Sequence, residues 1–283
     1  MSSSRSTKKD YLLQAFLIMS KSEHLHLGYC DDPDAVFTTN KELREAQENY
    51  LGICLNSVPE GVKTVLDIGC GTGEMIHRLA NKGYSVDGLV PDELLIKKIK
   101  EKVPGTEVHL SRFEHFKDYS KKYDLLLFME SFGYIKDMDV CLNNCLSLLN
   151  SGGYILITDF FSKDKKDVYS KNFHSLQEFK KKFVEHDQLE LVTHQDMTPN
   201  TVPTMRFTYH MCTEYFKPLV EVFADSIHSS LTRKRPFLYK MLTKFFGEKL
   251  IAKYKKRSGQ LKQIDPDYYK EACSYDLFLL KKK

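Results

Sequence analysis

Short apolar runs of strand length alternate with stretches of helical periodicity along most of this chain. Seven apolar runs cover residues 65–68, 84–90, 108–110, 123–129, 154–158, 189–194 and 273–280. The stretches that lie between them place apolar residues three and four positions apart, as in 74–81, in the segment after Asp92, in 139–149 and in 175–186. Such alternation is typical of a parallel sheet with crossover helices. We therefore expect an α/β fold with a doubly wound, seven-stranded, mostly parallel sheet.

Two further helical regions flank this core. Helices are expected at 11–20 and from 41 to about 58, the second with Thr38, Thr39 and Asn40 as N-cap candidates. A long segment, 199–269, separates the sixth and seventh strands and is rich in amphipathic patterns, so it predicts a helical lid rather than a loop. The predicted segments are an N-terminal helical segment (1–58), a ligand-binding core (59–198), the lid (199–269) and the last strand (270–283).

The first strand runs directly into a glycine-rich turn, Val65-Leu66-Asp67-Ile68-Gly69-Cys70-Gly71-Thr72-Gly73. Gly69, Gly71 and Gly73 permit a tight turn with positive φ and leave no Cβ between the backbone and a ligand. Because open α/β sheets bind ligands at the carboxyl ends of their strands, a small molecule is expected against this turn.

The glycine spacing separates two cofactor classes. A dinucleotide fingerprint, G-x-G-x-x-G, needs a third glycine at position 74, which is Glu74 here. The G-x-G-x-G spacing with Asp67 resembles motif I of the class I S-adenosylmethionine-dependent methyltransferases, and Asp124 and the stretch 148–154 also resemble that family. The segment 24–29 resembles the H-x-G-Y segment of its small-molecule subgroup, which includes sterol, tocopherol, sugar and ubiquinone-pathway enzymes. The resemblance implies a Rossmann-like methyltransferase fold.

The resemblance also implies roles for individual residues. Asp67 faces the ammonium of S-adenosylmethionine, and Tyr29 closes over its methionine end. The turn residues that contact the cofactor are Gly69, Cys70, Gly71 and Gly73. The family usually has an acid for the ribose hydroxyls where this chain has Val90. Asp92 is either a substitute for that acid or a simple helix N-cap.

The adenine position corresponds to Arg112 and Phe113, although an exposed loop is an equal reading for Arg112. Three residues are candidates for a base that removes a proton from the methyl acceptor. Glu130 ends the fourth strand, and His24 and His26 lie in the segment expected over the cofactor. Alternatively, Glu130 holds the cofactor's ammonium or caps a helix, and the histidines are ordinary loop residues. No metal site is expected.

Composition and charge restrict partners and compartment. The net charge is +4 with lysine and arginine in clusters, at 163–166, 180–182, 233–235 and 253–257. These clusters are either solvated helix faces or a surface for an acidic carrier protein, an anionic substrate or a membrane surface; no RNA-binding signature is present. The seven cysteines are scattered without zinc-site spacing. With no signal peptide or membrane-length apolar run, this predicts reduced thiols and a cytoplasmic protein.

The leading hypothesis is an enzyme that moves a methyl group from S-adenosylmethionine to an oxygen or carbon of a hydrophobic small molecule. Aryl, isoprenoid and acyl acceptors suit an apolar lid, and the acyl type includes carrier-bound groups. The first rival is a non-catalytic protein that binds the same cofactor or a partner. A less favoured rival is an NAD-dependent oxidoreductase, against which Glu74 and Val90 argue.

Overall fold

The structure is a computed structural model of the 283-residue chain. It describes residues 22, 24–163, 173–216, 218, 222 and 264–283. The predicted helix at 11–20, the basic clusters at 233–235 and 253–257 and most of the predicted lid lie outside the described residues.

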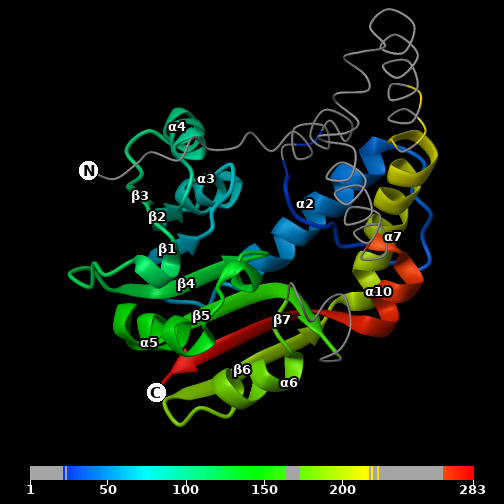
Figure 1. The fold of residues 1–283 in the computed structure, drawn as a ribbon. Helices are drawn as coiled ribbons and strands as arrows, with labels where there is room; N and C mark the ends of the chain where they lie inside the picture. Colours follow the sequence, from blue (N-terminus) through cyan, green and yellow to red (C-terminus); the bar gives the residue numbers. More distant parts are fainter. Residues whose placement is uncertain (1–21, 23, 164–172, 217, 219–221, 223–263) are drawn as a thin grey trace, which may run out of the picture.

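A seven-stranded sheet forms the centre of the molecule (Figure 1), and this confirms the predicted fold class. Its strand order is β3-β2-β1-β4-β5-β7-β6, with the first five strands parallel and β7 antiparallel to both β5 and β6. The strands are β1 (Thr64–Ile68), β2 (Ser85–Val90), β3 (Val108–Leu110), β4 (Tyr123–Met129), β5 (Leu149–Ser162), β6 (Leu189–Asp196) and β7 (Cys273–Lys282).

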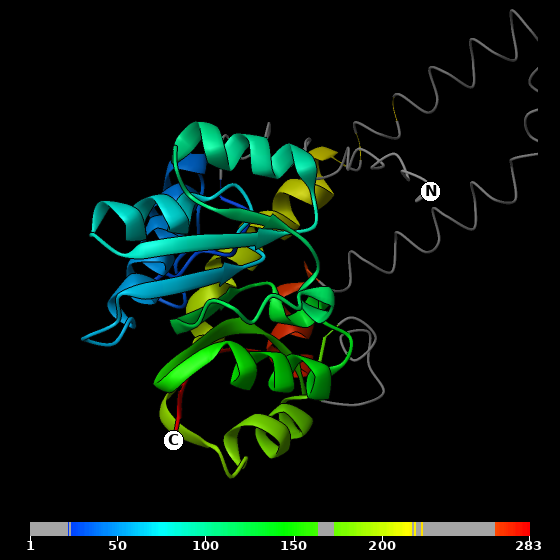
Figure 2. The same cartoon turned by 90° about the vertical axis from the view of Figure 1, so that its left-hand side faces the viewer.

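Helices cover both faces of the sheet (Figures 1 and 2). One apolar cluster packs the first face against α2 (Asn40–Asn56), α3 (Glu74–Asn81), α4 (Glu93–Lys102), α7 (Thr198–His210) and α10 (Pro266–Ala272). A second cluster, rich in phenylalanine, packs the other face against the 3₁₀ turns η1 (Phe113–His115) and η2 (Phe132–Tyr134), α5 (Met138–Leu148) and α6 (Leu176–Phe179). Both described ends of the predicted lid are helical: α7 continues as a π-helix, η5 (Met211–Phe216), and α10 leads into β7.

The expected helix caps are confirmed. The side chain of Thr39 accepts a hydrogen bond from the backbone N–H of Glu42, and the Glu42 carboxylate accepts one from the backbone N–H of Thr39, which completes a capping box at the start of α2. At α4, the Asp92 side chain accepts a hydrogen bond of 2.8 Å from the backbone of Leu94. Local sequence chemistry therefore defines where both helices begin.

Strand β5 and the helix after it differ from the sequence prediction. We expected a helix to residue 149 and a short strand at 154–158, but β5 begins at Leu149 and shifts register around a Gly152 that has a φ of 72°. Pairing with β7 then extends β5 beyond the predicted end, to Ser162. The helix expected at 175–186 is an α-helix only from Leu176 to Phe179 and continues as a π-helix, η4 (Lys180–Val184), for which the structure offers no physical reason.

The glycine turn packs tightly on the end of β4. Gly69 has a φ of 78°, and a Cβ on it would lie 2.4 Å from the Cβ of Ser131. The Ser131 hydroxyl also donates a hydrogen bond to the carbonyl of Ile68. The turn is thus fixed against the strand that carries the next candidate residue, Glu130.

We predict that Gly69→Ala destabilises the fold more than Gly83→Ala. Both glycines have positive φ, but a Cβ on Gly83 would have nothing within 4 Å. Gly83→Ala should therefore lose only the stability that a left-handed backbone costs a non-glycine residue, about 1–2 kcal/mol. Gly69→Ala adds overpacking, which typically costs a further ~1–3 kcal/mol. Urea unfolding measures both; equal losses would show that the contact with Ser131 relaxes without cost.

Candidate active site

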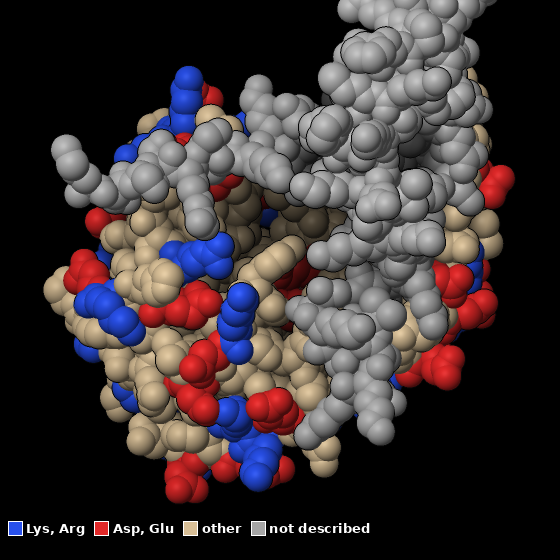
Figure 3. Space-filling view, viewed as in Figure 1, with Lys and Arg blue, Asp and Glu red and all other residues tan. Residues whose placement is uncertain are grey.

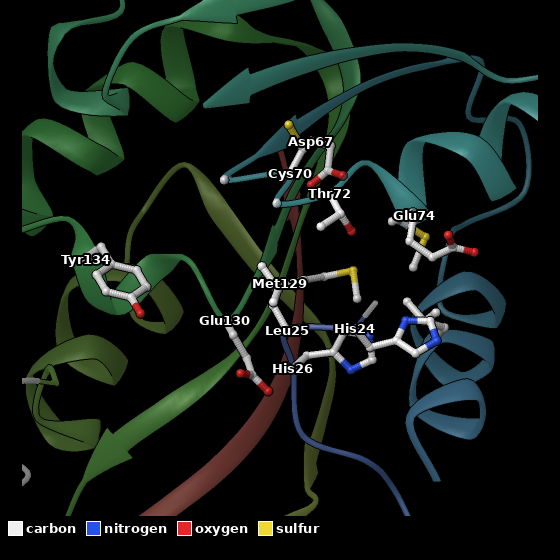
Figure 4. Close-up of a pocket in the computed structure, with 14 residues that line it drawn as sticks. His24, Leu25, His26, Asp67, Cys70, Thr72, Glu74, Met129, Glu130 and Tyr134 are labelled. Carbon is white, nitrogen blue, oxygen red and sulfur yellow. The ribbon is translucent and has the colours of Figure 1, made fainter. Parts of the chain in front are cut away.

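A cavity of about 210 Å³ opens at the carboxyl ends of β1 and β4 (Figure 4). This volume is below the roughly 300–1,000 Å³ of typical small-molecule pockets, so a nucleoside-sized ligand would extend beyond it. The described residues that line it are His24, Leu25, His26, Leu51, Asp67, Gly69, Cys70, Gly71, Thr72, Glu74, Met75, Met129, Glu130 and Tyr134. Sequence segments that are far apart therefore converge on the predicted ligand position.

The glycine turn forms one wall of this cavity. Gly71 and Gly73 have φ values of 51° and 79°, in the left-handed region that the spacing predicted. A Cβ on Gly73 would lie 2.9 Å from Ile99, whereas one on Gly71 would meet only Leu25, at 3.7 Å. Gly73 is thus required for packing, and Gly71 presents bare backbone to the cavity.

Asp67 lies at the bottom of the cavity with only 2% of its surface exposed. Among the described residues, nothing forms a hydrogen bond or an ion pair with its carboxylate. Burial raises the pKa of Asp67 to about 7. A buried carboxylate is unfavourable without a partner, so Asp67 is arranged for a cationic group of a ligand.

The charged residues that line the cavity are all acidic among the described residues. Three acids line it, and no lysine or arginine is among the described residues that do so. Glu74 is neutralised by Arg78 at 3.0 Å and Lys102 at 2.9 Å, which lie outside the lining. Asp67 and Glu130 have no such counter-ions. This arrangement fits a ligand with positive charge and does not fit the phosphates of a dinucleotide.

Glu130 is the most constrained residue of the site. Its φ of 49° makes it the one non-glycine with positive φ among the described residues. Its Oε1 accepts hydrogen bonds from the Leu27 N–H at 2.7 Å and from the Tyr275 hydroxyl at 2.6 Å. Burial raises the pKa of Glu130 to about 8. The two hydrogen bonds lower the pKa and so oppose this effect, and the nearby charge of Asp159 raises it by a smaller amount. A carboxyl group with this pKa can accept or donate a proton near neutral pH.

His26 is half-buried in the same cavity as Glu130 and is neutral at physiological pH. Its Nδ1–H donates to the Leu27 carbonyl at 2.7 Å, so the lone pair lies on Nε2, which is buried without a hydrogen-bond partner in the described structure. The ring packs on Tyr50 at 4.6 Å. Burial lowers the pKa of His26 to about 3, opposed by the hydrogen bond to Leu27. His26 can therefore accept a hydrogen bond, but it is a weak base.

His24 is part of a network of polar contacts with Glu48 and Arg78. Its Nε2 lies 3.0 Å from Glu48, whose other oxygen binds Arg78 at 2.7 Å. Nδ1 of His24 is buried and unpartnered among the described residues. The pairing with Glu48 orients His24 and leaves Nδ1 as its remaining acceptor.

Five of the residues implied by the resemblance lie outside the cavity lining. Tyr29 is half-buried and packs on the apolar cluster around α2. Val90 is buried at the end of β2, and Asp92 is the α4 N-cap. Arg112 precedes η1, and Phe113 is buried against Phe128. Their proposed cofactor contacts stay predictions.

Other residues of the site escaped sequence analysis. Leu25 and Thr72 lie inside the two motifs but were given no role by the sequence analysis, and Leu51, Met75, Met129 and Tyr134 line the cavity without any motif that marks them. Tyr275, which holds Glu130, lies in the last strand and could only be found through the register that pairs it with Phe160 of β5. Long-range pairing, not local pattern, supplies these residues.

One group of metal-ligand residue types occurs in the described structure, formed by Asp87, Glu107 and His109. Lys121 forms an ion pair with Asp87 at 2.5 Å, and Tyr123 donates a hydrogen bond to the same oxygen at 2.7 Å. Because the buried carboxylate is already neutralised, we assign no metal to this group.

Comparison with known proteins decides the family. Residues 30–196, more than half of the chain, match the family described as Methyltransferase domain. This chain belongs to that family. It is an S-adenosylmethionine-dependent methyltransferase of the small-molecule type, as the glycine spacing and Asp67 predicted.

Named relatives agree with this assignment. The malonyl-[acyl-carrier protein] O-methyltransferase 2 of Ilyobacter polytropus is 28% identical over 203 residues, covering 66% of this chain and 74% of that protein. The ubiquinone biosynthesis O-methyltransferase of Nitrosomonas europaea is 26% identical over 151 residues, covering 49% of this methyltransferase and 60% of that protein. Among solved structures, the O-methyltransferase of a trans-AT PKS multienzyme of Brevibacillus brevis, in complex with S-adenosyl-L-homocysteine, superposes with a TM-score of 0.61 at 18% identity, over 92% of this chain and 85% of that one.

Two further observations concern the helices and the cysteines. None of the helices within the described residues is both long and apolar enough to cross a membrane. None of the seven cysteines forms a disulfide in this structure, and five of them are buried.

We predict that Glu130→Gln stabilises the protein more at pH 8 than at pH 5. The folded-state pKa of Glu130 is about 8, above its unfolded value of ~4.3, so its burial is harmless below pH 4 and becomes increasingly destabilising as the pH rises to 8. Each unit of such a shift corresponds to about 1.4 kcal/mol, and glutamine removes the ionisation.

Urea unfolding of wild type and Glu130→Gln at both pH values measures this difference. Glu45→Gln, on the exposed side of α2, is the matched control and should show no pH-dependent change. An identical change in the free energy of unfolding at pH 5 and pH 8 for Glu130→Gln would contradict a raised pKa.

Proposed function

We propose that this methyltransferase transfers the methyl group to an oxygen of a largely apolar small molecule, with Glu130 as the base. The observation that carries the proposal is the half-buried Glu130 carboxyl group, held by Leu27 and Tyr275 in a cavity without lysine or arginine among its described residues. A hydroxyl nucleophile must lose a proton during transfer, and a group with a pKa near the working pH serves that role best. Methylation at carbon is the second possibility, which the same base could also serve.

The described residues fit S-adenosylmethionine on grounds independent of the family match. Asp67 offers an unpaired buried carboxylate for the α-ammonium group, and Gly71 leaves room against the backbone. When bound, the cofactor supplies a methyl group activated by a sulfonium. The cavity then needs to exclude water and align the acceptor, because positioning accounts for much of the rate of such transfers.

Glu130 is favoured over the two histidines as the base. His26 has a pKa of about 3 and is therefore a poor proton acceptor at neutral pH, although its free Nε2 can accept a hydrogen bond from the acceptor's hydroxyl. His24 is occupied by Glu48 on one nitrogen. The positive φ of Glu130 adds to the argument, since backbone strain is concentrated at functional positions.

The acceptor is proposed to be apolar because Leu25, Leu51, Met75 and Met129 line the cavity. Two named relatives are O-methyltransferases of malonyl-acyl-carrier protein and of ubiquinone biosynthesis, and their substrates are examples of a carrier-bound and an apolar acceptor. An acidic carrier protein remains the alternative partner. Basic and acidic side chains are interspersed over the described part of the face in Figure 3, so that face does not favour such a carrier. A cytoplasmic location also stays a prediction.

The first experiment is calorimetric titration with S-adenosylmethionine, S-adenosylhomocysteine and NAD. We expect the first two to bind wild type, NAD not to bind, and Gly71→Val to abolish binding, because the new side chain fills the ligand wall. Gly83→Val is the matched control, since it has the same positive φ but lies in open space. Failure of folded wild type to bind either sulfur ligand would refute the proposed function.

The second experiment tests Glu130 with a panel of hydroxylated aryl, isoprenoid and acyl acceptors. We expect Glu130→Gln to lower kcat about 10²–10⁴-fold, the usual loss for a general base. The wild-type kcat/KM for S-adenosylmethionine should rise with pH up to about 8, because this parameter reports the pKa of the free enzyme, before the charge of the bound cofactor lowers it. S-Adenosylmethionine carries a sulfonium charge that S-adenosylhomocysteine lacks, so the variant should also lose preference for the charged ligand. Unchanged kcat with an unchanged pH profile would exclude Glu130 as the base, and binding without turnover on any acceptor would favour the non-catalytic alternative.

A further inference from the structure

A short segment ahead of α2 covers the cavity, and we call residues 24–30 the strap. Four consecutive backbone N–H groups of the strap are hydrogen-bonded to other elements: Leu27 to Glu130 (2.7 Å), Gly28 to Thr204 of α7 (3.1 Å), Tyr29 to Ala46 of α2 (2.8 Å) and Cys30 to Asn200 of α7 (2.9 Å). Gly28 lies so close to α2 that a Cβ on it would be 2.5 Å from the Cβ of Ala46. The strap is therefore docked by specific contacts on both sides.

Gln47 is the buried polar residue beneath this strap. It lies on the apolar side of α2 beside Leu43, Tyr50 and Leu51, and none of its surface is exposed. Its Nε2 donates to the carbonyl of His26 at 2.8 Å, and its Oε1 accepts a hydrogen bond from the Ser22 hydroxyl at 2.7 Å. An apolar side chain would pack there without the cost of burying an amide. The amide nitrogen thus binds the strap, and the amide oxygen binds Ser22, two residues before the strap.

The same segment supplies three cavity residues and one contact to Glu130. His24, Leu25 and His26 line the cavity from the strap (Figure 4). The peptide that follows the His26 carbonyl provides the Leu27 N–H to Glu130. Because a peptide unit is planar, the hydrogen bond from Gln47 to the carbonyl fixes the direction of that N–H.

We propose that Gln47 is a positioning residue that clamps the strap over the cavity and aims the Leu27 N–H at Glu130. This inference rests on the proposed function, since it concerns the same base. Without the clamp, the strap peptide is free to rotate, and Glu130 keeps only its hydrogen bond from Tyr275. A hydrogen bond from the backbone favours the ionised carboxylate, so its loss raises the pKa of Glu130 further.

The other titratable groups around Glu130 do not change this direction. His26 of the strap stays neutral because burial lowers its pKa to about 3, and Asp67 of β1 lines the same cavity in wild type and variant alike. Tyr275 of β7, and Tyr50 and Cys54 of α2, stay neutral because burial raises the pKa of all three well above the physiological range. Asp159 of β5 has a pKa raised by burial to about 6 and is ionised where Glu130 titrates. Loss of the Leu27 hydrogen bond therefore shifts the acid limb of the pH–rate profile to higher pH.

The test compares wild type with Gln47→Met, which keeps the length and helix propensity of the side chain but removes its hydrogen bonds. Ser22→Ala is the second variant: it keeps the hydrogen bond from Gln47 to the His26 carbonyl but removes the one that Ser22 donates to Gln47 and the one that it accepts from the His24 N–H. Ile155→Val, a buried position on the other face of the sheet, controls for a general loss of stability. Hydrogen exchange of the peptide that spans the strap, binding of S-adenosylhomocysteine and the pH–rate profile are measured on all four proteins.

We expect Gln47→Met to accelerate exchange of the strap amides by about tenfold or more, to weaken S-adenosylhomocysteine binding and to move the acid limb to higher pH, with Ile155→Val unchanged in all three. Strap exchange and a pH profile equal to those of wild type would overturn the clamp while leaving the methyltransferase assignment intact. The exchange measurement needs no ligand. A wild type that binds no cofactor would therefore refute the proposed function, and the exchange rates would still show whether Gln47 holds the strap in place.

Discussion

The contact between Glu130 and its two hydrogen-bond donors is the interaction on which the site depends. One donor, Leu27, belongs to the segment before the core, and the other, Tyr275, belongs to the last strand. The Glu130 carboxyl group, directly after β4, thereby connects the segment before the core with the last strand beside the cavity. This contact is made by a group whose ionised form is disfavoured by burial, and the raised pKa of Glu130 is the direct result of that conflict.

The same reasoning explains why the cavity has an acidic lining. Asp67 is buried and Glu130 is half-buried, and desolvation raises the pKa of both carboxyl groups. A charge of the opposite sign on a ligand would lower these pKa values and recover the free energy that burial costs. The fold thus retains two carboxyl groups that have no cationic partner among the described residues, whereas Glu74, at the edge of the same cavity, is already neutralised by Arg78 and Lys102.

Sequence alone predicted the features of the fold and site that depend on local chemistry. The glycine turn, the caps at Thr39 and Asp92 and the alternation of strands and helices follow from residues close together in the chain, and the structure confirms them. Contacts between distant segments were not accessible in this way. Gln47 resembles an ordinary helix-surface residue in the sequence, and only the docking of the strap makes it buried. The extent of β5 depends similarly on its pairing with β7.

The strap combines a feature that is visible in the local sequence with contacts between distant segments. Its Gly28 is visible in the sequence as part of a short motif, but its physical role is close packing on Ala46 rather than a turn. Close packing at Gly28 brings the backbone near enough for Gln47 to reach the His26 carbonyl, and this in turn sets the peptide that contacts Glu130. The position of the Gln47 side chain on α2 therefore affects the candidate base through a series of direct contacts. If Glu130 is the base, as proposed, a residue outside the cavity lining then influences the ionisation of the catalytic group through one peptide unit.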